Sequence, residues 1–140
     1  PAIKREGHRS VVVRGLVPDF KEELRRYEML VVPLRVGGGI RLKILESFAM
    51  SVPVVSTSVG CEGIEAVHDE HLLIADTEEA FAGQVVRMFG DLELKEKLRN
   101  KARSLVVRRH RWEAIGEAFE KVYEEVVGRR HGGAKKARTQ

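Results

Sequence analysis

Short runs of β-branched and other apolar residues alternate with helical patterns along the chain, and this alternation limits the possible folds most. Four runs have the length and composition of β-strands: residues 10–14, 29–32, 54–56 and 72–74. The run Met29-Leu30-Val31-Val32 is wholly apolar, which is typical of a parallel strand that is buried on both faces. The sequence therefore predicts an α/β fold with a parallel sheet, right-handed crossovers and helices on both faces. We expect Val31 and Val55 in the centre of that sheet.

Helical patterns fill the spaces between the strands and the C-terminal half. Two of them cover residues 20–27 and 40–50, with Tyr27 on the apolar face of the first. Asp76 and Glu79 have the spacing of a capping box for a third helix, which ends at Gly90. A fourth begins at Asp91, and a fifth runs from Trp112, a predicted core anchor, to Val127. The residues expected to face inward on these last three helices are Phe81, Val85, Met88 and Phe89, then Leu94, Leu98, Ala102 and Leu105, then Ile115, Phe119, Val122 and Val126.

The 140 residues and 15.8 kDa correspond to one domain, with 43% hydrophobic and 33% charged residues. Cys61 is the single cysteine, so no internal disulfide forms, and we expect it to be a small buried side chain in a reducing, cytoplasmic compartment. No apolar run is long enough to span a bilayer, and the first residues do not resemble a signal peptide. Because the chain begins without Met, we expect a processed protein or a piece of a longer one.

The net charge of +4 comes from the C-terminal end. Residues 128–140 hold five bases and no acid, and removing those five from 25 leaves 20 bases against 21 acids. We therefore divide the chain into a lead-in (1–9), one domain (10–127) and a basic, flexible tail (128–140). A basic tail can contact anionic lipid at the inner face of a membrane, but a solvated terminus is the simpler interpretation. With 6% aromatic residues and a neutral body, the chain is not expected to bind nucleic acid.

Three glycines, Gly37 to Gly39, separate the strand at 29–32 from the helix at 40–50. They let the backbone approach a ligand closely, and the helix that follows offers unpaired N–H groups to a phosphate or diphosphate. Arg41 and Lys43 add positive charge near that end. The segment is neither a Walker P-loop nor a Gly-x-Gly-x-x-Gly motif, so a plain turn remains the alternative.

Glu46 is an acid in the middle of an apolar helix, beside Leu45 and Phe48. Such an acid either points to solvent or is held there to bind ligand hydroxyls, as acids bind ribose in dinucleotide folds. The sequence leaves both interpretations open.

The run from Gly39 to Thr57 (GIRLKILESFAMSVPVVST) resembles the donor-nucleotide motif of family-four retaining glycosyltransferases, the glycosyl transferases group 1. The resemblance extends to residues 13–19 and 60–64 and covers roughly residues 10–127. It implies the C-terminal domain of an enzyme with two Rossmann-like domains, which transfers a sugar from a nucleotide diphosphate sugar to an acceptor with retention. By this resemblance, Glu46 binds the donor ribose and residues 39–42 line its diphosphate. The predicted donor-binding residues are Gly38, Gly39, Ile40, Arg41, Leu42, Lys43 and Glu46.

The chain departs from the family pattern in two ways. Many members carry a second acid eight residues before the ribose-binding one, where this chain has Gly38. In addition, the resemblance implies two family strands before residue 10, with a diphosphate-clamping Arg and Lys, and an N-terminal acceptor domain, and we expect this chain to lack them. We therefore expect the chain alone to be inactive, and its exposed sheet edges to favour homo-oligomers.

The alternative function is a non-catalytic, truncated Rossmann-like module that binds nucleotide sugars or a protein partner. No catalytic residue and no metal ligand set is assigned from the sequence, and no cofactor is expected besides the donor substrate. Glu62 is a candidate to face the donor sugar. His68 and His71 are expected to form a solvated cluster with neighbouring acids.

Overall fold

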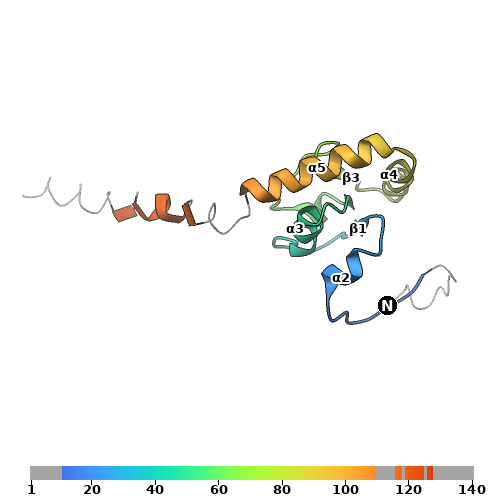
Figure 1. Ribbon diagram of the computed structural model, residues 1–140, viewed down its shortest axis with the longest axis horizontal. Helices are drawn as coiled ribbons and strands as arrows, with labels where there is room; N and C mark the ends of the chain where they lie inside the picture. The colour runs from blue at the N-terminus through green and yellow to red at the C-terminus, as the bar shows by residue number, and fades with distance from the viewer. Residues whose placement is uncertain (1–10, 110–115, 118, 125, 128–140) are drawn as a thin grey trace, which may run out of the picture.

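The computed structural model describes residues 11–109, 116–117, 119–124 and 126–127. Its centre is a parallel three-stranded sheet in the order β1-β2-β3 (Figure 1). The strands are β1 (Leu30–Val32), β2 (Val54–Ser56) and β3 (Leu73–Ile74). Val31 lies opposite Val55, and Val55 lies opposite Leu73. The predicted α/β class and parallel pairing are confirmed.

In the described part up to residue 109, four α-helices lie around the sheet: α2 (Phe20–Leu24), α3 (Leu42–Ala49), α4 (Glu78–Gly90) and α5 (Leu92–Arg109). A short 3-10 helix, η1 (Val59–Cys61), follows β2. Two helices are shorter than predicted. Helix α2 ends at Leu24 and leaves Tyr27 exposed, and α3 begins only at Leu42.

The predicted capping box of Asp76 and Glu79 is wrong. Thr77 caps α4 instead, and its hydroxyl accepts a hydrogen bond from the Ala80 N–H at 3.2 Å. Asp76 is occupied elsewhere, since its carboxylate accepts hydrogen bonds from Ser58 in the loop after β2. Asp91 does begin α5 as predicted, because it accepts from the Leu94 N–H at 2.8 Å.

The core has two parts, one on each face of the sheet. On one face, Val54 and Leu72 pack with Ile44 and Phe48 of α3. On the other, Val55 and Leu73 pack with Met88 of α4. This division follows from the strand period of two, which sends neighbouring residues to opposite faces. Helices on both faces are therefore confirmed.

Helix α5 joins the two parts of the core. Its first half contributes Leu94 and Leu98 to the α4 side, and its second half contributes Ala102 and Leu105 to the α3 side. Figure 1 shows the same arrangement, with α4 near the start of α5 and α3 beside its later turns. All four residues were predicted from the helical period, and all four are buried.

The first predicted strand does not form, and β1 is not central. Residues 11–14 have no strand structure, and Val11, Val12 and Val13 are exposed. The side chain of Val31 is 45% exposed, because β1 is the edge strand among the described residues and the α4-side core does not reach it. An apolar run is stable as a strand only beside a pairing partner, and residues 11–14 have none in the described part of the chain.

Other apolar predictions also fail. Phe89 is 57% exposed at the end of α4. The described residues between 116 and 127 are helical, but Phe119, Val122 and Val126 are exposed rather than inward-facing. Trp112, Ile115 and the basic tail lie outside the described residues, so the predictions for them stay predictions.

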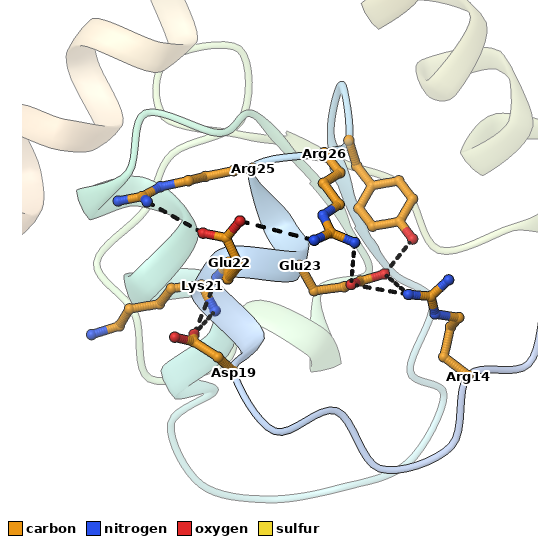
Figure 2. Close-up of polar contacts among 8 residues, drawn as sticks. Arg14, Asp19, Lys21, Glu22, Glu23, Arg25 and Arg26 are labelled. Carbon is orange, nitrogen blue, oxygen red and sulfur yellow. Dashed lines mark hydrogen bonds and ion pairs between the residues drawn. The ribbon is translucent and has the colours of Figure 1, made fainter.

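Ion pairs attach the segment before α2 to that helix (Figure 2). Asp19 caps α2 by accepting from the N–H groups of Lys21 and Glu22 at 2.8 and 3.1 Å. Glu23 lies 3.1 Å from a guanidinium nitrogen of Arg14 and 3.6 Å from one of Arg26. Residues 14–19 are thus held against α2 by charge and capping rather than by strand pairing.

The expected solvated cluster with acids is found for His68, whose exposed ring lies 3.3 Å from the Asp69 carboxylate, but not for His71. His71 is only 6% exposed, and its Nδ1 accepts a hydrogen bond from the Val67 N–H at 3.1 Å. His68 is exposed, but its Nδ1 likewise accepts from the Ile74 N–H at 2.8 Å. A ring nitrogen that accepts must be unprotonated, so the buried His71 contact requires a neutral imidazole.

Acidification should therefore destabilise the fold. Burial lowers the pKa of His71 below its ordinary value of 6.5, and Lys101 and Arg108 lower it further, against the opposing effect of Glu70. The unfolded chain then binds more protons at His71 than the folded chain, so stability is full above pH 6.5 and falls as the pH drops through the folded pKa. We expect urea midpoints to be lower at pH 5.5 than at pH 7.5. In His71→Asn, whose side-chain oxygen can accept the same N–H without titrating, this decrease should be smaller, and an unchanged decrease would contradict the assignment.

Candidate functional site

The carboxyl ends of the three strands meet at one edge, where ligands bind in parallel α/β sheets. The loop after β1 touches the loop after β2, because the Thr57 hydroxyl donates to the Leu34 carbonyl oxygen at 2.5 Å. A Cβ atom on Gly63 would lie 3.3 Å from Cγ1 of Ile40, so the Ile40 side chain also lies near the backbone of the second loop.

Gly60 allows the loop after β2 to lie this close to the strands. A Cβ atom there would collide with the Ser56 hydroxyl and lie 2.9 Å from the Val32 carbonyl oxygen. The Gly60 N–H donates to the Thr57 hydroxyl at 3.0 Å. Only glycine therefore fits this position without moving the loop.

The N-terminus of α3 is unlike those of α2, α4 and α5, because no side chain caps it. Asp19, Thr77 and Asp91 cap α2, α4 and α5, whereas Arg41 at the N-cap of α3 makes no capping hydrogen bond. The N–H groups of residues 42 and 43 have no acceptor in the described part of the chain. These donors and the positive end of the helix dipole suit an anion.

The glycines before α3 leave this end open. Nothing lies within 4 Å of the position of a Cβ atom on Gly38 or Gly39. Gly39 has φ +80°, a conformation that side-chain-bearing residues rarely adopt. The sequence pattern predicted this open turn correctly, although Ile40 and Arg41 precede the helix rather than begin it.

The cationic side chains at this end differ in position. The Arg41 guanidinium folds back over the glycines, and its Nη1 donates to the Gly38 carbonyl oxygen at 2.6 Å. Its buried Nε has no partner among the described residues. Lys43 is exposed on the first turn of α3 and makes no ion pair in this part of the chain. Both residues stand beside the open N–H groups in the chain, so their positive charges favour an anion there.

Glu46 lies one turn into α3, on the side that faces α2. Its side chain is 38% exposed, and Oε1 is 4.0 Å from Nζ of Lys21, which is also exposed. An exposed ion pair of this length contributes little stability. Glu46 is thus neither buried in the core nor committed to a strong partner, and its carboxylate stays accessible.

Two cavities open at the carboxyl ends of the strands. The first has a volume of about 410 Å³ and includes Glu62, the candidate to face the donor sugar. Its lining residues are Arg35, Val36, Gly37, Ser58, Val59 and Glu62. The second has a volume of about 270 Å³, and it is lined by Pro33, Arg35, Thr57, Asp76, Thr77, Glu78, Phe81 and Ala82.

Arg35, Asp76 and Glu78 were missed as site residues by sequence analysis. Arg35 lines both cavities and forms an ion pair with Glu78, which lines the second. Each follows the end of a strand closely. Asp76 is the second residue after β3, and Arg35 is the third residue after β1. Their position just after predicted parallel strands could have indicated them, because ligands bind at the carboxyl ends of such strands.

Cys61 is buried as predicted, and its thiol points to the Ser58 carbonyl oxygen at 3.5 Å. Burial raises the pKa of the Cys61 thiol, which disfavours the reactive thiolate. Within the described residues, no group of three or more His, Cys, Asp and Glu side chains could hold a metal ion. No helix of the described part is long and apolar enough to cross a membrane.

The part of the sequence that contains the glycines and α3 matches a known family. Residues 1–91 match the family "Glycosyl transferases group 1", and the chain belongs to this family. The predicted recognition is confirmed.

Two known proteins show how much of a relative this chain represents. It is 38% identical over 58 residues to the "uncharacterized 44.6 kDa protein in cps region" of Klebsiella pneumoniae, which covers 41% of this chain and 15% of that protein. Its fold is similar to the crystal structure of the C-terminal domain of the group 1 glycosyl transferase LpcC from Francisella tularensis. That similarity has a TM-score of 0.62 at 21% identity and covers 70% of this chain and 52% of the other. The chain therefore spans only part of both.

Proposed function

We propose that this chain is the donor-binding part of a glycosyltransferase that uses a nucleotide diphosphate sugar and retains configuration at the transferred sugar. The observation that carries the proposal is the uncapped N-terminus of α3 behind three glycines, within the region that matches the family. The similarity to a cps-region protein supports polysaccharide biosynthesis as the process. A single buried, free cysteine is consistent with action in the cytoplasm.

The chain's own groups divide the work of binding in this proposal. The N–H groups at the start of α3 and the Arg41 guanidinium hold the diphosphate, and the Glu46 carboxylate accepts hydrogen bonds from the ribose hydroxyls. When the bond between sugar and diphosphate breaks, negative charge gathers on the leaving diphosphate. Donors already placed there stabilise that charge more in the transition state than in the bound donor.

A non-catalytic binding module is the second candidate, and the residue that favours it is Gly38. This position carries no acid, so one carboxylate that many family members place there is lacking. A longer protein that contains this chain and transfers sugar would support the proposed enzymatic function over the binding module. Sugar transfer by the purified 140-residue chain alone would contradict the proposal that an acceptor domain is required.

Nucleotide binding is tested with Gly39→Val and the matched control Gly15→Val. Both glycines have positive φ, +80° and +73°, and nothing lies within 4 Å of a Cβ atom on either, so the backbone strain is similar. Only Gly39→Val places a side chain where the diphosphate must approach. In calorimetric titration with UDP and GDP, we expect Gly39→Val to weaken binding at least about tenfold, the equivalent of one charge-assisted hydrogen bond. Equal affinities of the two variants would contradict the proposal.

A further inference from the structure

The cavity beside β3 has the lining of a small-molecule site, although no motif pointed to it. Its volume of about 270 Å³ suits a ligand of one ring. One part of the lining is apolar and comes from Pro33, Phe81 and Ala82. The rest is polar and comes from two carboxylates, one guanidinium and two hydroxyl groups: Asp76, Glu78, Arg35, Thr57 and Thr77.

Several of these polar atoms are not used within the described structure. Asp76 accepts both of its hydrogen bonds from Ser58 through Oδ1, at 2.7 and 2.9 Å, which leaves Oδ2 without a donor among the described residues. Arg35 pairs with Glu78 through one nitrogen and one oxygen. The other Arg35 nitrogens and Glu78 Oε2 have no partner in that part of the chain. The cavity therefore offers free acceptors and free donors beside an apolar surface.

The cavity lies next to the proposed donor site. Arg35 lines it and also lines the neighbouring cavity, which includes Gly37 and Glu62. Thr57 and Ser58 are adjacent in the loop after β2, and each lines one of the two cavities. A ligand ring in the smaller cavity would thus lie on the far side of Arg35 from the glycine turn.

We propose that this cavity is a subsite for one sugar ring of the acceptor, an inference that rests on the proposed glycosyl transfer. A pyranose ring combines an apolar C–H face with hydroxyl groups that both donate and accept. Its C–H face fits against Pro33 and Phe81, and its hydroxyl groups bind Asp76, Glu78 and Arg35. A nucleobase fits less well, because Phe81 also packs against the core beneath α4 and does not offer a free face for stacking.

The test uses the full 140-residue chain and the methyl glycosides of glucose, galactose and mannose as probes. Amide chemical shifts are followed by NMR, because a one-ring ligand is expected to bind in the millimolar range. At least one glycoside should shift the amides of Arg35, Thr57, Asp76 and Phe81. Absence of shifts with all three glycosides, or shifts at this cavity with uridine alone, would overturn the inference.

A matched pair of variants tests whether the glycoside binds in this cavity. Ala82→Met extends a side chain into the cavity, whereas Ala80→Met makes the same change at another exposed position of the same helix that does not line the cavity. Methionine is a good helix former, so both variants should fold. We expect glycoside affinity to fall at least about tenfold in Ala82→Met, as a filled cavity cannot hold the ring, and to be unchanged in Ala80→Met. Equal glycoside affinity in both would overturn the assignment.

The same variants separate this inference from the proposed function. UDP binding should be equal in the wild type, Ala80→Met and Ala82→Met, since neither alanine lines the cavity that includes Gly37. If UDP binds and the glycosides do not, the sugar subsite is wrong and the donor site stands. If glycosides bind this cavity and UDP does not bind, the subsite stands and the donor assignment fails.

Discussion

Replacing Phe48 by alanine is expected to lower the free energy of unfolding by about 3–5 kcal/mol, because a large buried ring is removed and its cavity cannot fully close. Phe48 is fully buried and packs with Ile44, Val54 and Leu72, where α3 meets the sheet. A loss of this size is a large part of the roughly 5–15 kcal/mol that stabilises an ordinary domain. Urea denaturation followed by circular dichroism measures it.

The matched control is Phe89→Ala, which makes the same chemical change on α4. Phe89 is 57% exposed, so its replacement should cost less than about 1 kcal/mol. Similar losses for the two variants would mean that α3 does not pack on the sheet as described.

Glu46→Gln is expected to weaken binding of UDP about ten- to hundredfold, because one charge-assisted hydrogen bond contributes roughly 1.5–3 kcal/mol. Glutamine keeps the shape of the side chain but replaces one carboxylate oxygen by a donor group. The direction of the change in UDP affinity is informative, because removing a negative charge near a diphosphate should by itself strengthen binding. A loss of affinity therefore indicates contact with hydroxyl groups rather than with phosphate.

Pyrophosphate and a second variant make this test specific to ribose. Glu46→Gln should not weaken the binding of pyrophosphate, which has no ribose. Glu93→Gln removes the same charge from an exposed position on α5, so it should leave UDP affinity unchanged. Equal UDP affinity of wild type and Glu46→Gln would rule out the ribose role.

Periodicity predicted the parts of the fold that depend on local sequence. The parallel pairing of β1 with β2 and the buried stripe of α5 were both predicted, because apolar spacing alone sets which face of an element is buried. Residues 11–14 and Val31 were predicted wrongly, because their burial depends on neighbouring strands and helices rather than on their own composition. The cap of α4 was wrong for a related reason, since Asp76 bonds to a loop that is distant in sequence.

The candidate site was predicted in part. The glycines before α3 stand next to one another in the sequence, so the open turn could be predicted from them. Arg35 comes from the loop after β1, whereas Asp76 and Glu78 come from the segment after β3, and the parallel arrangement of the strands brings them to one cavity. The side toward which Glu46 points also depends on the position of α2, which periodicity does not give.

The central claim is that a nucleotide diphosphate binds at the start of α3, and a map of amide chemical shifts during UDP titration tests it most directly. We predict that the largest shifts fall on residues 37–43, with smaller ones near Glu46. Residues 97–108 provide an internal comparison, because Lys97, Lys101 and Arg108 lie together on the exposed face of α5 and attract any anion. No shift at residues 37–43, or shifts confined to the basic face of α5, would contradict the account.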